Sequence, residues 1–223
     1  MSDSITASRL EQACEELLVG AVNAAEVTVR RIALRAGTNI AAVNYHFGSV
    51  EKLIFSVGNR VYLRLNAERL ALLQQAVQRA RPDPAPAGEL IAALVGPSVR
   101  WSLDPGSSYR VLKHITTIAQ SSQNPEIFQP MVEDIQHHRS FIPHFRRVAP
   151  WLGEAEIGFR ISCILGIRSQ LIRNRSRTET LTDHAFDLGD PDVVLSHLIA
   201  VTVPMFAAPT GADPNSVSNS SLR

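Results

Sequence analysis

The stretch Val29–Ser49, VRRIALRAGTNIAAVNYHFGS, decides the fold because it encodes two short helices joined by a tight turn. Thr28 suits the N-cap of a first helix over 29–36, since its hydroxyl can accept a hydrogen bond from an early backbone N–H. Gly37 ends that helix, because glycine adopts a positive φ without steric cost. A second helix follows at once and runs to about Phe47. Two such helices across one turn predict a helix-turn-helix.

The rest of the chain also has the pattern of helices. Apolar residues recur at helical spacing, and no run alternates with period two between hairpin turns. The sequence therefore predicts an all-α fold with about nine helices. Besides 29–36 and 38–47, we expect helices at 7–18, 50–81, 88–103, 107–121, 126–148, 153–176 and 190–207, with a polar loop over 177–190.

Charge is distributed unevenly along a chain whose net charge is only +1. Between Thr28 and Arg64 there is one acid, Glu51, and the basic residues are Arg30, Arg31, Arg35, Lys52, Arg60 and Arg64. Acids dominate the segment before Thr28. A local basic segment in a neutral chain is typical of DNA-binding proteins, although ordinary solvated helices are often basic too.

The second helix of the pair carries the residue types that read DNA. Val43 and Phe47, four residues apart, can anchor it to the core, which leaves small and polar residues on its outer face. Small side chains let a helix enter the major groove, and Asn44 can bond an adenine edge. Tyr45 and His46 can donate to phosphate oxygens. With the helix N-termini included, the predicted DNA-binding residues are Thr28, Arg30, Thr38, Asn39, Ala41, Ala42, Asn44, Tyr45, His46, Ser49 and Lys52.

These motifs carry a family resemblance. The segment from about Leu10 to Ile54 resembles the N-terminal domain of the TetR (tetracycline-repressor-like) family, and its matching elements are Val29–Gly37, Val43–Phe47 and Gly48-Ser49 followed by Glu51 and Leu53. The resemblance implies an all-helical homodimer that is controlled by a small ligand in its C-terminal domain. It also implies that Tyr45 and His46 contact the DNA backbone and bases from the third helix.

Two positions depart from the family pattern. Val50 stands where the family often has a lysine that approaches a phosphate, and whether Lys52 replaces that cation is open. Asn23 stands where the family usually has glycine in the turn before the second helix. Asn is tolerable there because it visits the left-handed region readily.

The resemblance divides the chain into three parts. Residues 1–49 form the helix-turn-helix DNA-binding domain, 50–208 form the ligand-binding and dimerisation domain, and 209–223 form a tail that we expect to be disordered. Apolar faces on the last two helices can build a four-helix bundle between two chains, or they can pack within one chain only. The residues predicted at the dimer interface are Ile161, Leu165, Gly166, Val194, Leu198 and Val201.

A ligand cavity is expected between the middle helices. Its candidate contacts are Trp101, Tyr109, Ile118, Phe128, Met131, Phe141, Phe145 and Arg168, of which the apolar ones could equally be ordinary core residues. Arg168 falls on an apolar face, where a buried guanidinium needs an anionic partner. That partner is either a ligand carboxylate or an acid such as Asp187 or Asp192 across the dimer, and the protein acid is the favoured alternative.

The ligand class follows only from a looser resemblance. The Asn44–Ser49 string, the Phe159…Gly166 helix and the closing 197–208 segment resemble a branch of the family that responds to long-chain fatty acids or their CoA esters. This implies an elongated apolar or acyl effector, and no cofactor is expected.

Catalytic and membrane functions are disfavoured. We interpret His137, His138 and His144 as a solvated helical face, because no cysteine or carboxylate joins them at metal-ligand spacing. No signal sequence is evident, and the most apolar stretch, Val193–Ala208, is too short and too polar to cross a membrane. The sequence therefore predicts a cytoplasmic, ligand-responsive regulator, most simply a repressor, that binds a near-palindromic operator as a dimer. The alternative is a helical partner-binding protein that has lost DNA binding.

Overall fold

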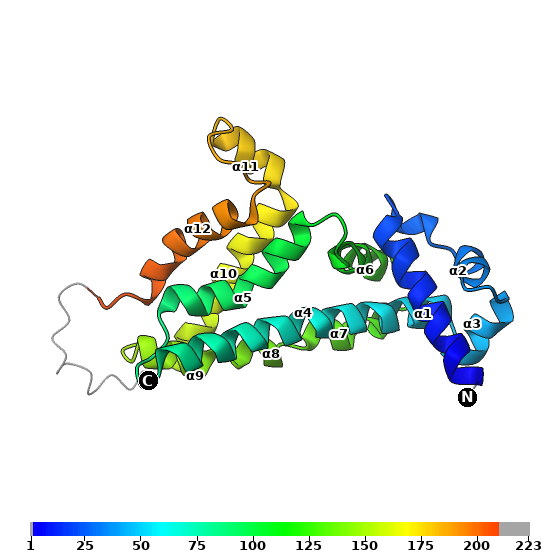
Figure 1. Cartoon of the computed structure of the whole chain (residues 1–223), viewed down its shortest axis with the longest axis horizontal. Coiled ribbons are helices and arrows are strands. Elements are labelled where there is room, and N and C mark those ends of the chain that lie inside the picture. The colour runs from blue at the N-terminus through cyan, green and yellow to red at the C-terminus, as the bar shows by residue number, and fades with distance from the viewer. Residues whose placement is uncertain (1, 210–223) are drawn as a thin grey trace. The chain divides into compact units, whose positions relative to one another are not determined.

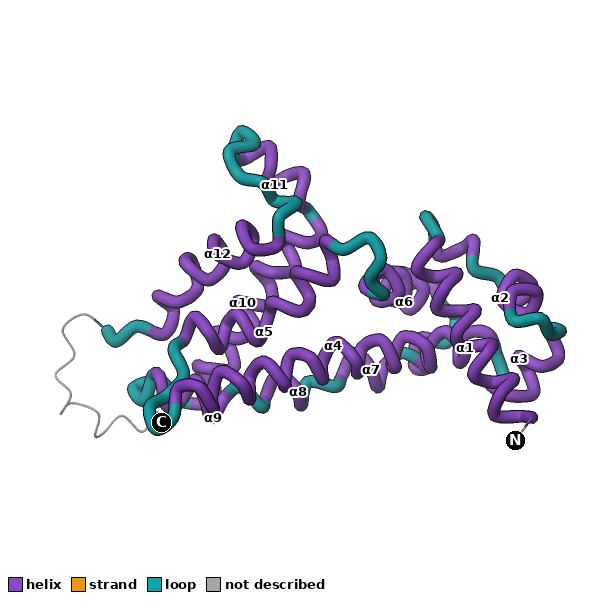
Figure 2. The backbone as a smooth tube through the Cα atoms, in the orientation of Figure 1, coloured by secondary structure: helices purple, strands orange, loops and turns teal. Residues whose placement is uncertain are grey.

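The computed structural model describes residues 2–209, and within them the backbone is helix and connecting loop without a strand (Figure 2). The elements are α1 (Ser2–Gly20), η1 (Ala24–Glu26), α2 (Val29–Arg35), α3 (Ile40–Phe47), α4 (Val50–Ala80), α5 (Ala87–Leu103), α6 (Tyr109–Ser121), η2 (Pro125–Ile127), α7 (Gln129–Glu133), α8 (Gln136–Arg139), α9 (Ile142–Val148), α10 (Glu154–Arg173), α11 (Arg175–Leu181), α12 (Pro191–Thr202) and η3 (Val203–Phe206). The all-α prediction is confirmed. The expected tail lies outside the described residues from 210 onward.

The chain folds into two compact units. Unit 1 comprises Met1–Glu68 and Arg100–Ile135, and unit 2 comprises Arg69–Val99 and Gln136–Arg223. Helices α4 and α5 each contribute residues to both units. The functional boundary after residue 49 therefore does not coincide with a break between compact units, and it stays a prediction.

In unit 1, α1, α2 and α3 gather around the N-terminal part of α4, and α6 packs on α1 (Figure 1). One apolar core joins them: Leu10, Leu18, Ile32, Val43, Leu53, Val57, Val111, Ile115 and Phe128 are all buried. Gly58 permits the close approach of α4 and α6, because a Cβ there would stand 1.8 Å from Cδ1 of Ile115. The helices of the helix-turn-helix and α6 thus share a single core.

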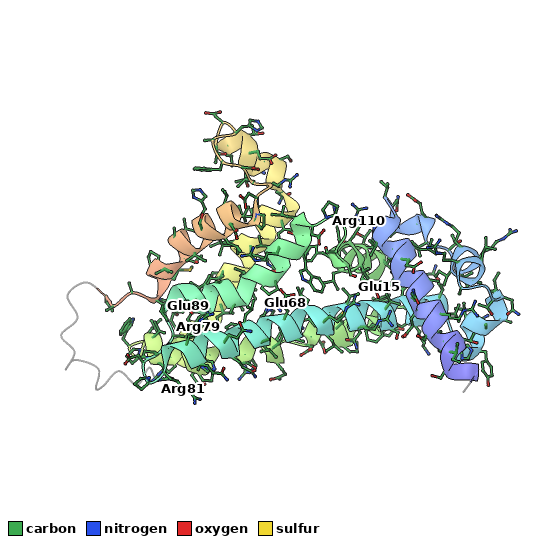
Figure 3. The ribbon with its side chains drawn as sticks, in the orientation of Figure 1. Glu15, Glu68, Arg79, Arg81, Glu89 and Arg110 are labelled. Atoms are coloured by element: carbon green, nitrogen blue, oxygen red, sulfur yellow. The ribbon has the colours of Figure 1, made fainter. Side chains whose placement is uncertain are left out.

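In unit 2, α10 packs against α9, α11 and α12. Glycines on α5 bring that helix close to α12, since a Cβ on Gly88 would lie 3.4 Å from Cγ2 of Ile199. Phe145 and Phe206 stack with ring centroids 4.2 Å apart. An ion pair of 3.0 Å between Arg79 and Glu89, both labelled in Figure 3, links the end of α4 to the start of α5.

Two expected segments differ from the structure. The single helix predicted over 126–148 is wrong, because the chain breaks it into η2, α7, α8 and α9. Pro125, Pro130 and Pro143 each occupy one of the first two positions of a short helix, where the missing amide costs least, so each proline begins a helix rather than continuing one. The loop predicted over 177–190 is wrong at its start, since α11 runs to Leu181.

Candidate nucleic-acid interface

The turn between α2 and α3 is held by local hydrogen bonds. The Oγ1 atom of Thr28 accepts from the backbone N–H of Arg31 at 3.3 Å, which caps α2. Gly37 has φ +65°, and the next N–H, from Thr38, donates to the carbonyl of Ala33 at 2.9 Å. This closing pattern requires a left-handed residue after the helix, which explains glycine at position 37.

The next two helices begin in the same way. The Oδ1 atom of Asn39 accepts from the N–H of Ala42 at 3.0 Å and caps α3, and the Oγ atom of Ser49 accepts from the N–H of Lys52 at 3.2 Å and caps α4. Each capping oxygen is therefore engaged. The side-chain amide of Asn39 and the hydroxyl protons of Thr28 and Ser49 can still donate to an anion at these helix N-termini.

The face of α3 opposite the apolar core carries the residues that are predicted to contact bases and phosphates. Val43 is fully buried, whereas Ala41, Asn44 and Tyr45 are exposed, Tyr45 at 74%. The Tyr45 and His46 rings meet edge to face with centroids 4.9 Å apart. The sequence-based orientation of this helix, with its apolar face inward, agrees with these exposures.

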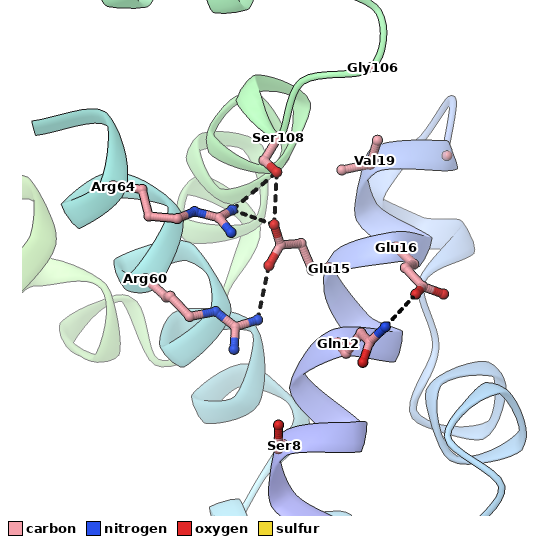
Figure 4. Close-up of a pocket in the computed structure, with 10 residues that line it drawn as sticks. Ser8, Gln12, Glu15, Glu16, Val19, Arg60, Arg64, Gly106 and Ser108 are labelled. Atoms are coloured by element: carbon pink, nitrogen blue, oxygen red, sulfur yellow. Dashed lines mark hydrogen bonds and ion pairs between the residues drawn. The ribbon is translucent and has the colours of Figure 1, made fainter. Parts of the chain in front are cut away.

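The basic segment of the sequence separates into two sets. Three arginines are neutralised by the acids of α1. Arg35 pairs with Glu16 at 2.7 Å, and Arg60 pairs with Glu11 at 3.0 Å. Arg60, at 2.9 Å, and Arg64 both pair with Glu15 (Figure 4). These pairs were not predicted from the sequence, although the excess of acids before Thr28 indicates partners for nearby arginines.

Three cations of that segment form no ion pair within the described part of the chain. Arg30 and Lys52 are exposed, and Arg31, also exposed, donates from Nη1 to the carbonyl of Glu26 at 2.8 Å. The Nζ atom of Lys52 lies 3.8 Å from the position that a Cβ on Gly48 would take, so the ammonium group lies beside the turn between α3 and α4. Val50 is half-buried and packs against the unit 1 core. Arg9 of α1, which the sequence reasoning did not select, lies over the other turn, with Nη2 2.7 Å from the Cβ position of Gly37.

A polar cleft of about 680 Å³ opens beside the paired arginines (Figure 4). Its lining includes Gln12 and Glu15 of α1, Arg60 and Arg64 of α4, and Ser108 at the start of α6. Ser108 donates to Glu15 at 2.7 Å. Burial alone would raise the pKa of Glu15, but hydrogen bonds from Arg64, Ser108 and Arg60 lower it below its ordinary value.

The residues predicted to contact a ligand are divided between the two units. Trp101, Tyr109, Ile118, Phe128 and Met131 belong to unit 1, while Phe141, Phe145 and Arg168 belong to unit 2. Phe128 is fully buried in the core shared by α3 and α4, and the indole N–H of Trp101 donates to Glu68 at 2.8 Å. Within unit 1, Trp101, Ile118, Phe128 and Met131 therefore belong to or pack against the core of the helix-turn-helix.

Two histidines near Arg168 were misjudged from the sequence. The reading of His137 as part of a solvated face is wrong, since it is only 5% exposed and its ring lies 3.9 Å from that of His138. Burial, together with the positive charges of His137, Arg69 and Arg168, lowers the pKa of His138 to about 2. Across residues 2–209, no three His, Cys, Asp or Glu side chains come together to hold a metal ion.

Three of the residues predicted at the dimer interface are buried within the single chain. Ile161, Val194 and Leu198 pack between α10, α12 and the rest of unit 2. They are buried within the single chain, and their place at a dimer interface stays a prediction. Gly166 and Val201 are exposed, Val201 at 62%, and Leu165 is half-buried. Phe159, which the sequence reasoning did not select for the interface, is exposed at 66% on α10.

A helix-turn-helix with an exposed, polar second helix, followed by a larger helical region, defines the class of DNA-binding regulators with an effector domain. Two family models match the chain: "Bacterial regulatory proteins, tetR family" over residues 18–57, and "Tetracyclin repressor-like, C-terminal domain" over residues 92–204. The chain belongs to the TetR family. Members of this family are transcription factors, not enzymes, that bind DNA operators and small-molecule ligands and act as dimers.

Solved structures agree on the fold. A transcriptional regulator from Rhodococcus sp. Rha1 is 18% identical with a TM-score of 0.63, over 90% of this chain and 95% of that one. The multidrug binding protein EbrR, complexed with imidazole, is 15% identical with a TM-score of 0.55, over 93% of this chain and 98% of that one. No curated protein sequence matches the chain. In residues 2–209, none of the helices has the length and apolar character needed to cross a membrane.

Replacing Glu15 by Gln tests the ion-pair network. The pKa of this carboxyl is below 4.5 in the folded protein, so its charge stabilises the fold above that pH, and the contribution is lost as the pH falls through the folded-state value. At about pH 7, Glu15→Gln should lower the free energy of unfolding by about 2 kcal/mol. The deficit should shrink as the pH falls from about 7 through the lowered folded-state pKa of Glu15.

Urea unfolding of both proteins across this pH range measures the effect. Asp83→Asn, in the exposed segment after α4, is the control and should leave the pH profile unchanged. A deficit that is the same at every pH would show that Glu15 acts through packing alone.

Proposed function

We propose that the protein is a repressor that binds a near-palindromic operator as a homodimer and releases it when a small effector binds. The observation that carries this proposal is the outer face of α3, where Asn44 and Tyr45 are exposed between two capped helix N-termini. In a dimer, two such helices would enter successive major grooves about 34 Å apart. Asn44 would read a base edge, while Tyr45 and His46 would position the helix on phosphates.

Phosphate binding is assigned to a small set of groups. Because Arg35, Arg60 and Arg64 are neutralised by acids of α1, the remaining positive charge near the turns comes from Arg30, Arg31 and Lys52. The family often has a lysine that approaches a phosphate at the position occupied here by Val50. We assign that phosphate contact to Lys52. The capped N-termini at Thr28, Asn39 and Ser49 add backbone donors and dipole charge.

Helix α6 is the route by which an effector would act on α3. Near its start, Arg110 donates to the carbonyl of Val19 at 3.1 Å, and His114 lies 3.1 Å from the carbonyl of Ala21, so both hold the end of α1. Beyond its end, Ser122 and Asn124 donate to Glu51 at 2.6 Å and 2.9 Å. These hydrogen bonds lower the pKa of Glu51.

A displacement of α6 would therefore move both α1 and the start of α4, and with them α3. A ligand that binds better to the displaced arrangement would weaken operator binding by that difference in affinity. The effector is proposed to be a small apolar or acyl compound, such as a fatty acid or its CoA ester. The fold it shares with a multidrug binding protein is in keeping with a small organic ligand.

The outer faces of α10 and α12 are proposed as the dimer interface. Phe159, Gly166 and Val201 are exposed, and a Cβ on Gly166 would meet no atom within 4 Å. An exposed aromatic ring beside a glycine suits close packing of a second helix. Four helices, two from each chain, would then form the bundle.

Replacing Tyr45 or His46 by Ala tests the function. DNA selected from a random pool by the wild-type protein supplies the operator, and a gel-shift titration measures its affinity. Each substitution should weaken binding about tenfold or more, because several phosphate and base contacts are lost at the centre of the interface. Leu63→Ala, at an exposed site farther along α4, is the matched control.

Sedimentation should show the same oligomeric state for all of these proteins. Unchanged affinity in both variants would contradict the assignment of α3. Failure of the wild-type protein to select any DNA would favour the alternative function, a helical partner-binding protein.

The salt dependence of DNA binding tests Lys52. Lys52→Ala should reduce the slope of log affinity against log salt concentration by about one, because one phosphate contact is lost, and Val50→Lys in the same background should restore it. Lys113→Ala, at an exposed site on α6, should leave the slope unchanged. An unaltered slope in Lys52→Ala would mean that Lys52 does not contact phosphate.

Negative charges introduced on the outer faces of α10 and α12 test the proposed dimer interface. The double variant Phe159→Glu/Val201→Glu should sediment as a monomer, because like charges would face each other where apolar surface is expected to be buried. Leu181→Glu, which is 75% exposed on α11, is the control and should remain a dimer. A dimeric double variant would place the interface elsewhere.

A further inference from the structure

Helix α3 leaves its first residue, Ile40, outside the apolar core. The Ile40 side chain is 44% exposed, whereas Val43 in the same helix is fully buried, and Ala42 and Phe47 pack against the unit 1 core. A single exposed isoleucine is common at protein surfaces, so exposure alone assigns it no role. The role of Ile40 follows from the residues that share its face of the helix.

Ile40 and Asn44 lie four residues apart and therefore form one stripe along α3. Asn44 is exposed, and its side-chain amide forms no hydrogen bond within residues 2–209. The other amide at this end of the helix is engaged, since Oδ1 of Asn39 accepts from the N–H of Ala42 at 3.0 Å and caps α3. The stripe thus presents an apolar side chain and an available amide, one helical turn apart.

The composition of α3 restricts the bases that it can recognise. The helix contains no Lys, Arg, Asp or Glu. In the major groove, arginine and lysine make the commonest contacts with guanine, and acids accept from cytosine. Asparagine instead bonds the edge of adenine, and an apolar side chain packs on the 5-methyl group of thymine. The exposed stripe of α3 therefore matches A·T pairs rather than G·C pairs.

We propose that α3 reads A·T pairs in each operator half-site, with Asn44 bonded to an adenine edge and Ile40 packed on a thymine methyl group. Four residues of α-helix span about 6 Å, and successive base pairs are about 3.4 Å apart. The thymine contacted by Ile40 therefore lies no more than about two base pairs from the adenine contacted by Asn44. The inference rests on the proposed operator binding and specifies which bases the reading helix recognises.

Modified bases test both contacts in the DNA that the full-length wild-type protein selects from a random pool. Deoxyuridine replaces each thymine in turn, which removes only the 5-methyl group, and 7-deazaadenine replaces each adenine, which removes the N7 acceptor. Gel-shift titration at one salt concentration measures the affinities. At one thymine, deoxyuridine should weaken binding about fourfold in each half-site, because one buried methyl group is lost. The adenine that responds to 7-deazaadenine should lie within about two base pairs of it.

Substitutions then assign the methyl contact to Ile40. Ile40→Ala should bind the thymine and deoxyuridine operators within about twofold of each other, since the side chain that meets the methyl group is gone. Ile40→Val should keep part of the difference. Ile135→Ala is the matched control, because Ile135 is 49% exposed outside the helix-turn-helix, and it should keep the difference in full. Asn44→Ala should likewise lose the response to 7-deazaadenine.

The outcomes separate the recognised bases from the function itself. If the wild type selects DNA but no thymine responds to deoxyuridine, the inference is wrong and operator binding stands. A response that persists undiminished in folded Ile40→Ala protein would also overturn it, because another residue would then contact the methyl group. If the wild type selects no DNA, the proposed function fails and the inference fails with it.

Discussion

The ion pairs between the acids of α1 and the arginines of α2 and α4 are the constraint on which unit 1 depends. Arg60 and Arg64 converge on Glu15, and Arg35 holds Glu16, so α1 is fixed to both neighbours of α3 by charge as well as by the apolar core. These pairs are partly exposed, and each alone contributes modestly. As a network they set which cations remain for another partner, and hence where an anion can bind.

The apolar core of unit 1 also connects α3 with helices outside the helix-turn-helix. Phe128 and Ile115 pack with Leu53 and Val57, so the segment that the family assigns to the C-terminal domain completes the core of the helix-turn-helix. A tightly packed core of this kind changes between discrete arrangements more readily than it deforms continuously. A movement of α6, as proposed above, would therefore reach the start of α4 through this core.

The sequence predicted the local elements well because their signals are local. Thr28, Gly37 and Asn39 are caps and stops whose chemistry acts within a few residues, and the structure shows those hydrogen bonds. What the sequence did not predict depends on partners far along the chain: the pairing of Arg60 with Glu15, and the burial of His137. Helical periodicity cannot distinguish a basic residue facing water from one facing another helix.

Charged groups are satisfied differently in the two units. In unit 1, Arg35, Arg60 and Arg64 pair with acids of α1, whereas Arg30, Arg31 and Lys52 stay exposed near the helix-turn-helix without an ion pair in the described residues. In unit 2, the Nε atom of the buried Arg69 donates to the backbone carbonyl of Leu94, so a main-chain oxygen takes up that donor. A ligand can shift a protein between two states only by the difference between its affinities for them, so an effector must distinguish two arrangements of these packed helices.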